Sequence, residues 1–153
     1  MPERRTIERA RTDKREGKAP STQAGEFVRE EMDHIRAGKH GARSTKQAIA
    51  IGLSKARRAG VALPPPRKGQ ASERTRKSAK RAYQRGHETP AGHAESAKRA
   101  LASERALQRE PKRAASHVAL VRQAKSVARR KTATQRSASA KRAARTREAH
   151  PSA

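Results

Sequence analysis

The chain contains no cysteine and no tryptophan, and it has one phenylalanine and one tyrosine among its 153 residues. Without cysteine it forms no disulfide, gives no thiolate to a metal ion and has no cysteine nucleophile. Proteins that bind single-stranded nucleic acids stack the bases on aromatic side chains, and Phe27 and Tyr83 are too few for such a surface. These absences exclude thiol chemistry and disfavour recognition of RNA through stacked bases.

Large apolar residues are also scarce. Leucine, isoleucine, valine and phenylalanine together number 15, about a tenth of the chain, and most other hydrophobic residues are alanine. A highly charged chain with less than roughly 20% of such residues tends to be disordered, because it buries too little apolar surface to offset the ordering entropy. No apolar run approaches the roughly 20 residues that span a bilayer. We therefore expect that the protein forms no pocket for a small-molecule substrate and that it does not span a membrane.

Positive charge is what the chain has in excess. It carries 39 lysines and arginines against 14 acidic residues, a formal net charge of +25. A charge of this size is informative about partners, because a polyanion such as nucleic acid screens the self-repulsion. Anionic membrane surfaces are a weaker candidate. The expected partner is DNA, with RNA as the alternative.

The composition changes along the chain and predicts four segments. We expect an exposed charged helix or a disordered arm at residues 1–20 and a small helical unit at residues 21–63. A proline-rich spacer is expected at residues 64–70, and a basic tail at residues 71–153. Residues 70–153 hold 22 lysines and arginines against six acidic residues, a net charge of +16. The expected fold is mostly α: a small N-terminal helical unit followed by a long, basic, helix-prone but largely disordered tail.

Two helices are expected in the 21–63 unit. The first, Ser21–Arg36, shows an apolar stripe with helical spacing. The second begins at Ser44, where Ser-Thr-Lys-Gln is the pattern of a capping box. The run at 48–53 also fits a strand with period 2, but the cap before it and Gly60 after it favour a helix. Ile51 faces away from the apolar stripe of this helix, either as a single exposed residue or as a partner contact.

One short fragment recurs in the tail. Ser-Ala-Lys-Arg-Ala occurs at 78–82, 96–100 and 139–143, and a near-copy lies at 111–115. The first two copies are 18 residues apart, about five helical turns, so both can present cations on one helix face. Small alanines spaced by cations build no deep pocket, but they place positive charge along a polyanion. Tail helices are predicted over roughly 72–85, 89–109 and 112–130.

The candidate contact residues are cations in both parts of the chain. The helix that begins at Ser44 offers backbone N–H groups at its N-terminus, with Lys39, Arg43 and Lys46 close by, which suits one phosphate. On the outward side of that helix we expect Lys46, Lys55, Arg57 and Arg58. The predicted nucleic-acid-binding residues are Lys39, Arg43, Lys46, Lys55, Arg57, Arg58, Lys80, Arg81, Lys98, Arg99, Lys141 and Arg142.

The histidines give no sequence signal for a metal site. His34 and His40 are separated by five residues, as are His87 and His93, but neither pair has a cysteine or a third histidine to complete four ligands. Asp33 beside His34 lacks the nucleophile of a catalytic triad. The sequence therefore predicts no metal, no cofactor, no catalytic residue and no enzyme activity.

Residues 39–56, Lys-His-Gly-Ala-Arg-Ser-Thr-Lys-Gln-Ala-Ile-Ala-Ile-Gly-Leu-Ser-Lys-Ala, resemble the signature of a family of small, basic bacterial proteins. Members of that family have no known function and are often described as DNA-binding. The specific part is Gln-Ala-Ile-Ala-Ile-Gly-Leu-Ser at 47–54, and the resemblance extends over roughly residues 1–85. The tail is similar in composition to bacterial histone-H1-like proteins. These resemblances imply DNA binding and supply no catalytic residue.

We therefore expect a nucleoid-associated or histone-like protein of the cytoplasm that binds DNA without sequence specificity, by neutralising phosphates. The first alternative is an RNA- or ribosome-associated basic protein, because it uses the same electrostatics. The second is an adaptor whose 21–63 helices dock on another protein. The composition leaves the oligomeric state open.

Overall fold

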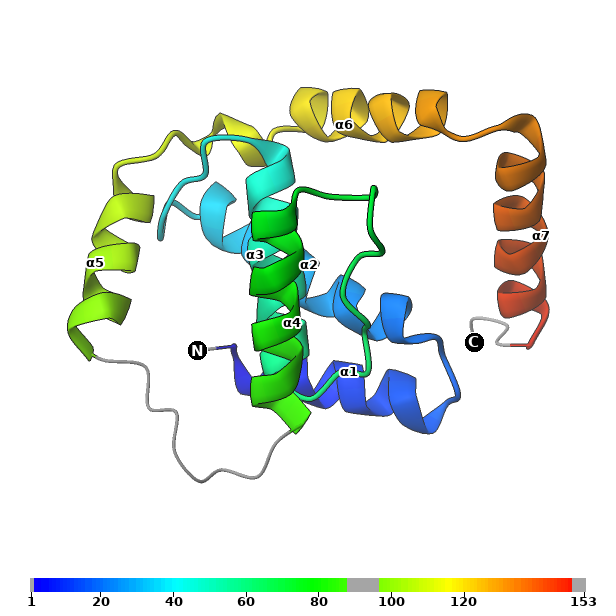
Figure 1. Ribbon diagram of the computed structural model, residues 1–153, viewed down its shortest axis with the longest axis horizontal. Coiled ribbons are helices and arrows are strands. Elements are labelled where there is room, and N and C mark those ends of the chain that lie inside the picture. The colour runs from blue at the N-terminus through cyan, green and yellow to red at the C-terminus, as the bar shows by residue number, and fades with distance from the viewer. Residues whose placement is uncertain (1, 88–96, 150–153) are drawn as a thin grey trace. The chain divides into compact units, whose positions relative to one another are not determined.

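The computed structural model describes residues 2–87 and 97–149, the side chains of 97–100 excepted, and these residues form an all-α protein (Figure 1). The chain divides into two compact units, Met1–Ser116 and His117–Ala153. The helices are α1 (Arg4–Arg15), α2 (Pro20–Arg36), α3 (Thr45–Arg58), α4 (Glu73–His87), α5 (Ala97–Gln108), the short 3₁₀ helix η1 (Lys112–Ala115), α6 (His117–Arg130) and α7 (Ala133–Ala149).

The core of the first unit lies between α1, α2 and α3. Its largest buried side chain is Phe27 of α2, which is 1% exposed. Ala10 of α1 and Ala56 of α3 are buried in the same cluster, and Leu53 and Leu63 pack against it. Phe27 is the one ring of this core cluster, and small side chains from three helices close the core around it.

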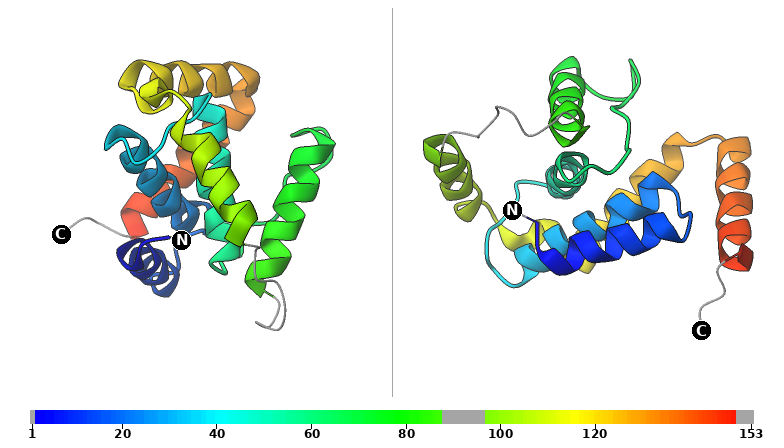
Figure 2. Two further views of the ribbon diagram at one scale, coloured as in Figure 1. Left: turned by 90° about the vertical axis from the view of Figure 1, so that its left-hand side faces the viewer. Right: turned by 90° about the horizontal axis from the view of Figure 1, so that it is seen from below.

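The helix α1 belongs to this core. It packs along α2 (Figure 2) and buries Thr6 and Ala10, while Ile7 packs against the apolar cluster. An ion pair between Arg9 Nε and Glu26 Oε2, at 3.2 Å, also joins the two helices. The helix predicted for residues 1–20 is therefore present, but it is packed rather than exposed all round.

The predicted start of α3 is confirmed. Ser44 is the N-cap residue, and its Oγ accepts a hydrogen bond from the backbone N–H of Gln47 at 3.2 Å. The Gln47 side chain accepts one from the N–H of Arg43 at 2.9 Å, one residue before the donor used in the usual capping box. The run at 48–53 is helical, so the strand alternative is excluded.

The predicted end of α3 is confirmed as well. Gly60 has φ of +85°, a conformation that residues with a Cβ rarely adopt. The N–H of Val61 then bonds to the carbonyl of Ala56, and that of Gly60 to the carbonyl of Arg57, at 3.1 Å each. This Schellman motif turns the chain away from the helix axis.

Two glycines bring helix backbones close together. A Cβ built on Gly52 of α3 would lie 2.7 Å from the Cα of Val28 in α2. A Cβ on Gly86 of α4 would collide with the carbonyl oxygen of Arg57 in α3. Helix α3 therefore packs on α2 and on α4 (Figure 2) through contacts that only glycine permits.

The largely disordered tail predicted after residue 70 is wrong. The described residues of this segment form α4, α5, η1, α6 and α7. Helix α4 packs on α3 and buries Ala79 and Ala82, the two alanines of the first Ser-Ala-Lys-Arg-Ala copy. The prediction weighed large apolar residues alone. Alanine has the highest helix propensity and loses no side-chain entropy on burial, so an alanine-rich segment can fold with little apolar mass.

The near-copy of the repeat at 111–115 is also part of the first unit. The 3₁₀ helix η1 lies against α2 and α3, and its Ala114 and Ala115 are buried. The carbonyl of Ala114 accepts a hydrogen bond from Thr45 Oγ1 at 2.7 Å, and that of Ala115 accepts one from Arg36 Nε at 3.2 Å. A segment predicted as tail therefore closes the end of the α2–α3 pair.

The second unit differs from the first in having no buried residue among its described helices, α6 and α7. Val118 and Val127 of α6 are exposed by 65% and 41%. Throughout the described part of the chain, no helix combines the length and the apolar composition that crossing a bilayer needs. The two helices of this unit therefore expose most of their side chains to solvent.

We expect Gly52→Ala to destabilise the protein by about 1–3 kcal/mol, because the added methyl group overpacks the contact with Val28. The usual effect of replacing glycine by alanine inside a helix is a gain of about 1 kcal/mol. Gly25→Ala in α2 is the matched control, since nothing lies within 4 Å of its added Cβ. Urea denaturation followed by circular dichroism should give opposite signs for the two variants. A stabilising Gly52→Ala would contradict the close contact.

Candidate nucleic-acid interface

Among the described residues of the first unit, acids form ion pairs with seven lysines and arginines and with His34 and His40. The carboxylate of Glu3, for example, lies 2.8 Å from His34 Nε2 and 3.1 Å from Lys39 Nζ. The hydrogen bonds from His34 and then from Lys39 lower the pKa of Glu3. The acids in ion pairs are Glu3, Asp13, Glu16, Glu26, Glu30, Glu31, Asp33 and Glu73. These pairs reduce the charge that the first unit presents to a polyanion.

Lys55 does not face outward as predicted. Its Nζ lies 2.7 Å from Glu31 Oε2 and 3.7 Å from Glu30 Oε1, and both glutamates are buried in α2. The helix periodicity of α3 placed Lys55 opposite the apolar stripe. It gave no sign that α2 brings two buried carboxylates to that side. Lys55 is the counter-ion of these carboxylates.

Arg57 is likewise turned inward, in contrast to the prediction. It is 6% exposed and donates from Nε to the carbonyl of Leu63 and from Nη2 to that of Pro64, at 3.1 and 3.2 Å. Burial lowers the pKa of its guanidinium. These hydrogen bonds from Arg57 fix the start of the proline-rich segment against α3. The segment predicted as a spacer is therefore packed on the first unit.

The other predicted cations around α3 are exposed. Arg43, Lys46 and Arg58 face solvent, and Lys39 is exposed beside its partner Glu3. At the helix N-terminus the N–H of Gln47 is already bonded to Ser44, and the predicted phosphate position stays a prediction. These cations lie around both ends of α3 and form no single line.

The predicted cations of the repeats have different surroundings. Lys80 and Arg81 of α4 are exposed, because the alanines on either side of them face α3. Lys141 and Arg142 are exposed on α7. Lys98 and Arg99 belong to α5, and their side chains lie outside the described residues. In α4 the repeat therefore has two faces, one of packed alanines and one of free cations.

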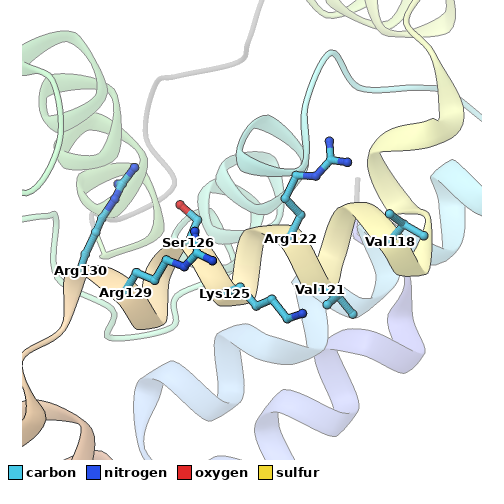
Figure 3. A pocket seen from close by; sticks show the side chains of 7 residues that line it. All are labelled: Val118, Val121, Arg122, Lys125, Ser126, Arg129 and Arg130. Carbon is cyan, nitrogen blue, oxygen red and sulfur yellow. The ribbon is translucent and has the colours of Figure 1, made fainter.

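An open groove along α6 was not predicted from the sequence (Figure 3). It is lined by cations spaced by three, four and one residues, Arg122, Lys125, Arg129 and Arg130, with Ser126 between them and Val118 and Val121 at its N-terminal end. Spacings of three and four residues put Arg122, Lys125 and Arg129 on one side of the helix, and Arg130 is at the edge of that side. A helix over 112–130 was predicted, but none of these four cations was among the predicted contact residues.

The charge of the second unit has almost no internal counter-charge. Residues 117–149 contain ten lysines and arginines and one acid, Glu148. Among the described residues of α6 and α7 no cation is in an ion pair. In this unit the positive charge is therefore exposed and unpaired.

The aromatic rings do not form a stacking surface for bases. Phe27 is in the core, 1% exposed. Tyr83 stacks on His87 one helical turn later, with ring centroids 4.0 Å apart and an interplanar angle of 16°. The described surface thus offers cations to phosphates rather than rings to bases.

Residues 11–68 match the model of a family of unknown function (DUF6496). This match begins within α1 and includes α2, α3 and the proline-rich segment, so the resemblance noted from the sequence is confirmed for that part of the chain. Comparison with curated proteins finds no match, and neither does comparison with solved structures.

We expect Lys55→Met to cost about 3–5 kcal/mol of stability, because it leaves two buried carboxylates without their counter-ion. Lys46→Met, on the exposed side of the same helix, removes the same charge and should change stability by about 0.5 kcal/mol or less. Urea denaturation of both full-length variants measures the difference. Equal stability of the two variants would show that Lys55 has no structural role.

Proposed function

We propose that this protein binds DNA without sequence specificity, and that the cationic helices α6 and α7 supply most of the contacts. The observation that carries the proposal is the unpaired charge of residues 117–149, ten cations against one acid on helices without a buried residue. Exposed lysines and arginines bind a polyanion by releasing its condensed counter-ions, which requires no particular base sequence.

The cations of the α6 groove are spaced along the helix over a length that contains several phosphates of a DNA duplex. Arg122 and Arg129 are seven residues apart, which is about 10 Å along a helix at 1.5 Å per residue. Duplex DNA carries about six phosphates over that length, at one charge per 1.7 Å. Arg122, Lys125 and Arg129 therefore meet a charge density higher than their own (Figure 3).

The first unit has the more modest part in this proposal. Seven of its described lysines and arginines, Lys55 among them, are paired with carboxylates, and Arg57 is bonded to backbone carbonyls. The exposed Lys80 and Arg81 of α4 remain as additional phosphate contacts. The sequence placed half of the predicted contacts around α3 and half in the repeats; the proposal gives most of the contacts to α6 and α7, which hold Lys141 and Arg142 of the predicted set.

Replacing Arg122, Lys125 and Arg129 together by glutamine should lower the slope of log K against log salt by about 3, since each phosphate contact contributes about 0.9. Fluorescence anisotropy with a random-sequence duplex, measured at salt concentrations of about 50–200 mM, gives the slope for each variant. Affinity for duplexes of different sequence should fall equally, because no base contact is removed.

The matched control replaces Arg29, Arg36 and Arg76 by glutamine. These arginines are paired with acids. The formal charge of the protein therefore changes by the same amount, but no unpaired cation that could contact DNA is removed. A control variant that loses as much slope as the α6 variant would refute the role of α6. Preferential binding of a structured RNA over the duplex in competition would instead identify RNA as the target.

A further inference from the structure

We propose that the first unit binds one divalent transition-metal ion, of the zinc class, through Glu31, His34 and His40. Each of these residues offers one ligand atom, and the three atoms lie within 4.8 Å of one another. The site is separate from the cationic helices α6 and α7, and it does not depend on DNA binding.

The fold brings the three residues together from two segments. Glu31 and His34 are three residues apart on α2, so they share one side of that helix. Gly38, with φ of +77°, ends the helix, and the N–H of Lys39 bonds back to the carbonyl of His34 at 3.0 Å. This turn returns His40 to the side of α2 that carries Glu31. Counting ligands along the sequence did not include Glu31, because nothing in the sequence marks it as buried.

The contact between Glu31 and His40 calls for a positive ion. Glu31 is 0% exposed, its Oε1 receives no hydrogen bond, and His40 Nε2 lies 3.4 Å from that oxygen. The other ring nitrogen, Nδ1, is 3.1 Å from the carbonyl of Gly41. If Nδ1 carries the proton and donates it to that carbonyl, Nε2 directs a lone pair at a carboxylate oxygen. Two lone pairs in this position repel each other unless a proton or a metal ion lies between them, and the proposal assigns a metal ion to this position.

The observed separation suits a zinc ion. Ligands about 2.0–2.1 Å from tetrahedral zinc lie roughly 3.3 Å from one another, and Glu31 Oε1 and His40 Nε2 are 3.4 Å apart. The hydrogen bond from His40 Nδ1 to a backbone carbonyl is the outer interaction that metal-bound histidines usually make. Two imidazoles and one carboxylate favour zinc, cobalt or nickel over magnesium and calcium, which prefer oxygen ligands.

Neighbouring charges complete the site. Lys55 Nζ lies 2.7 Å from Glu31 Oε2, whereas His40 lies beside the other carboxylate oxygen, Oε1. Glu3 Oε1, 2.8 Å from His34 Nε2, adds a second negative charge beside the ligands. The side chains of His34 and His40 are 15% and 14% exposed, which leaves an approach for an ion from solvent.

Calorimetric titration of the full-length protein, stripped of metal with EDTA and then dialysed, tests the proposal with zinc chloride as the probe. We expect one saturable site with a dissociation constant of about 1 µM or tighter, and a higher melting temperature with zinc than without it. His40→Gln and His34→Gln should each weaken binding by about 100-fold or more. Wild-type protein without a saturable site would overturn the proposal.

The matched controls are His87→Gln and His117→Gln, which remove exposed histidines on α4 and α6 and should leave zinc affinity unchanged. Binding by His40→Gln as tight as that of wild type would refute the site. Because a ligand variant can also fail to fold, a second measurement uses the wild-type chain. In proton NMR, one equivalent of zinc should shift the imidazole signals of His34 and His40 alone, and equal shifts of all the histidines would also refute the site.

Discussion

The fold depends on close contact between small residues, because the chain has too few large apolar side chains to fill a core in the ordinary way. Gly52 brings α3 against the backbone of Val28, and Gly86 brings α4 against the carbonyl of Arg57. Alanines of α1, α2, α3, α4 and η1 are buried between these backbones. Dispersion contacts of many backbone atoms at short range replace the area that leucine or phenylalanine would bury. A single methyl group at either glycine therefore affects the position of a whole helix.

The second organising feature is the division of charge between the units. In the first unit acids take part in ion pairs, and two of them, Glu30 and Glu31, are buried with Lys55 as their counter-ion. A buried carboxylate is costly unless a charge or hydrogen-bond donor faces it. Both carboxylates therefore fix α3 beside α2 through Lys55, and in our proposal Glu31 also binds a metal ion with His34 and His40. In the second unit one acid faces ten cations, so the charge remains available to a polyanion.

Local signals in the sequence predicted the helices of residues 21–63 well, missed α7, and predicted the surroundings of the helices poorly. The capping pattern at Ser44 and the glycine at position 60 predicted both ends of α3, because a cap is an interaction of the backbone with its nearest residues. The helices after residue 70 were expected to be mostly disordered, since apolar mass was the criterion. The inward turn of Lys55 and Arg57 had no local signal, because their partners come from α2 and from the proline-rich segment.

The sequence by itself determined the absence of thiol chemistry, the helical class and the large positive charge, because composition and short-range periodicity are properties of the chain. The tertiary structure decided which alanines pack, which cations are taken by carboxylates and which are left for a partner. The repeat shows the difference: the alanines of copy 78–82 are buried against α3, whereas those of copy 139–143 are exposed on α7. Identical residues have different roles because burial and ion pairing depend on whether another helix packs against them and which side chains that helix carries.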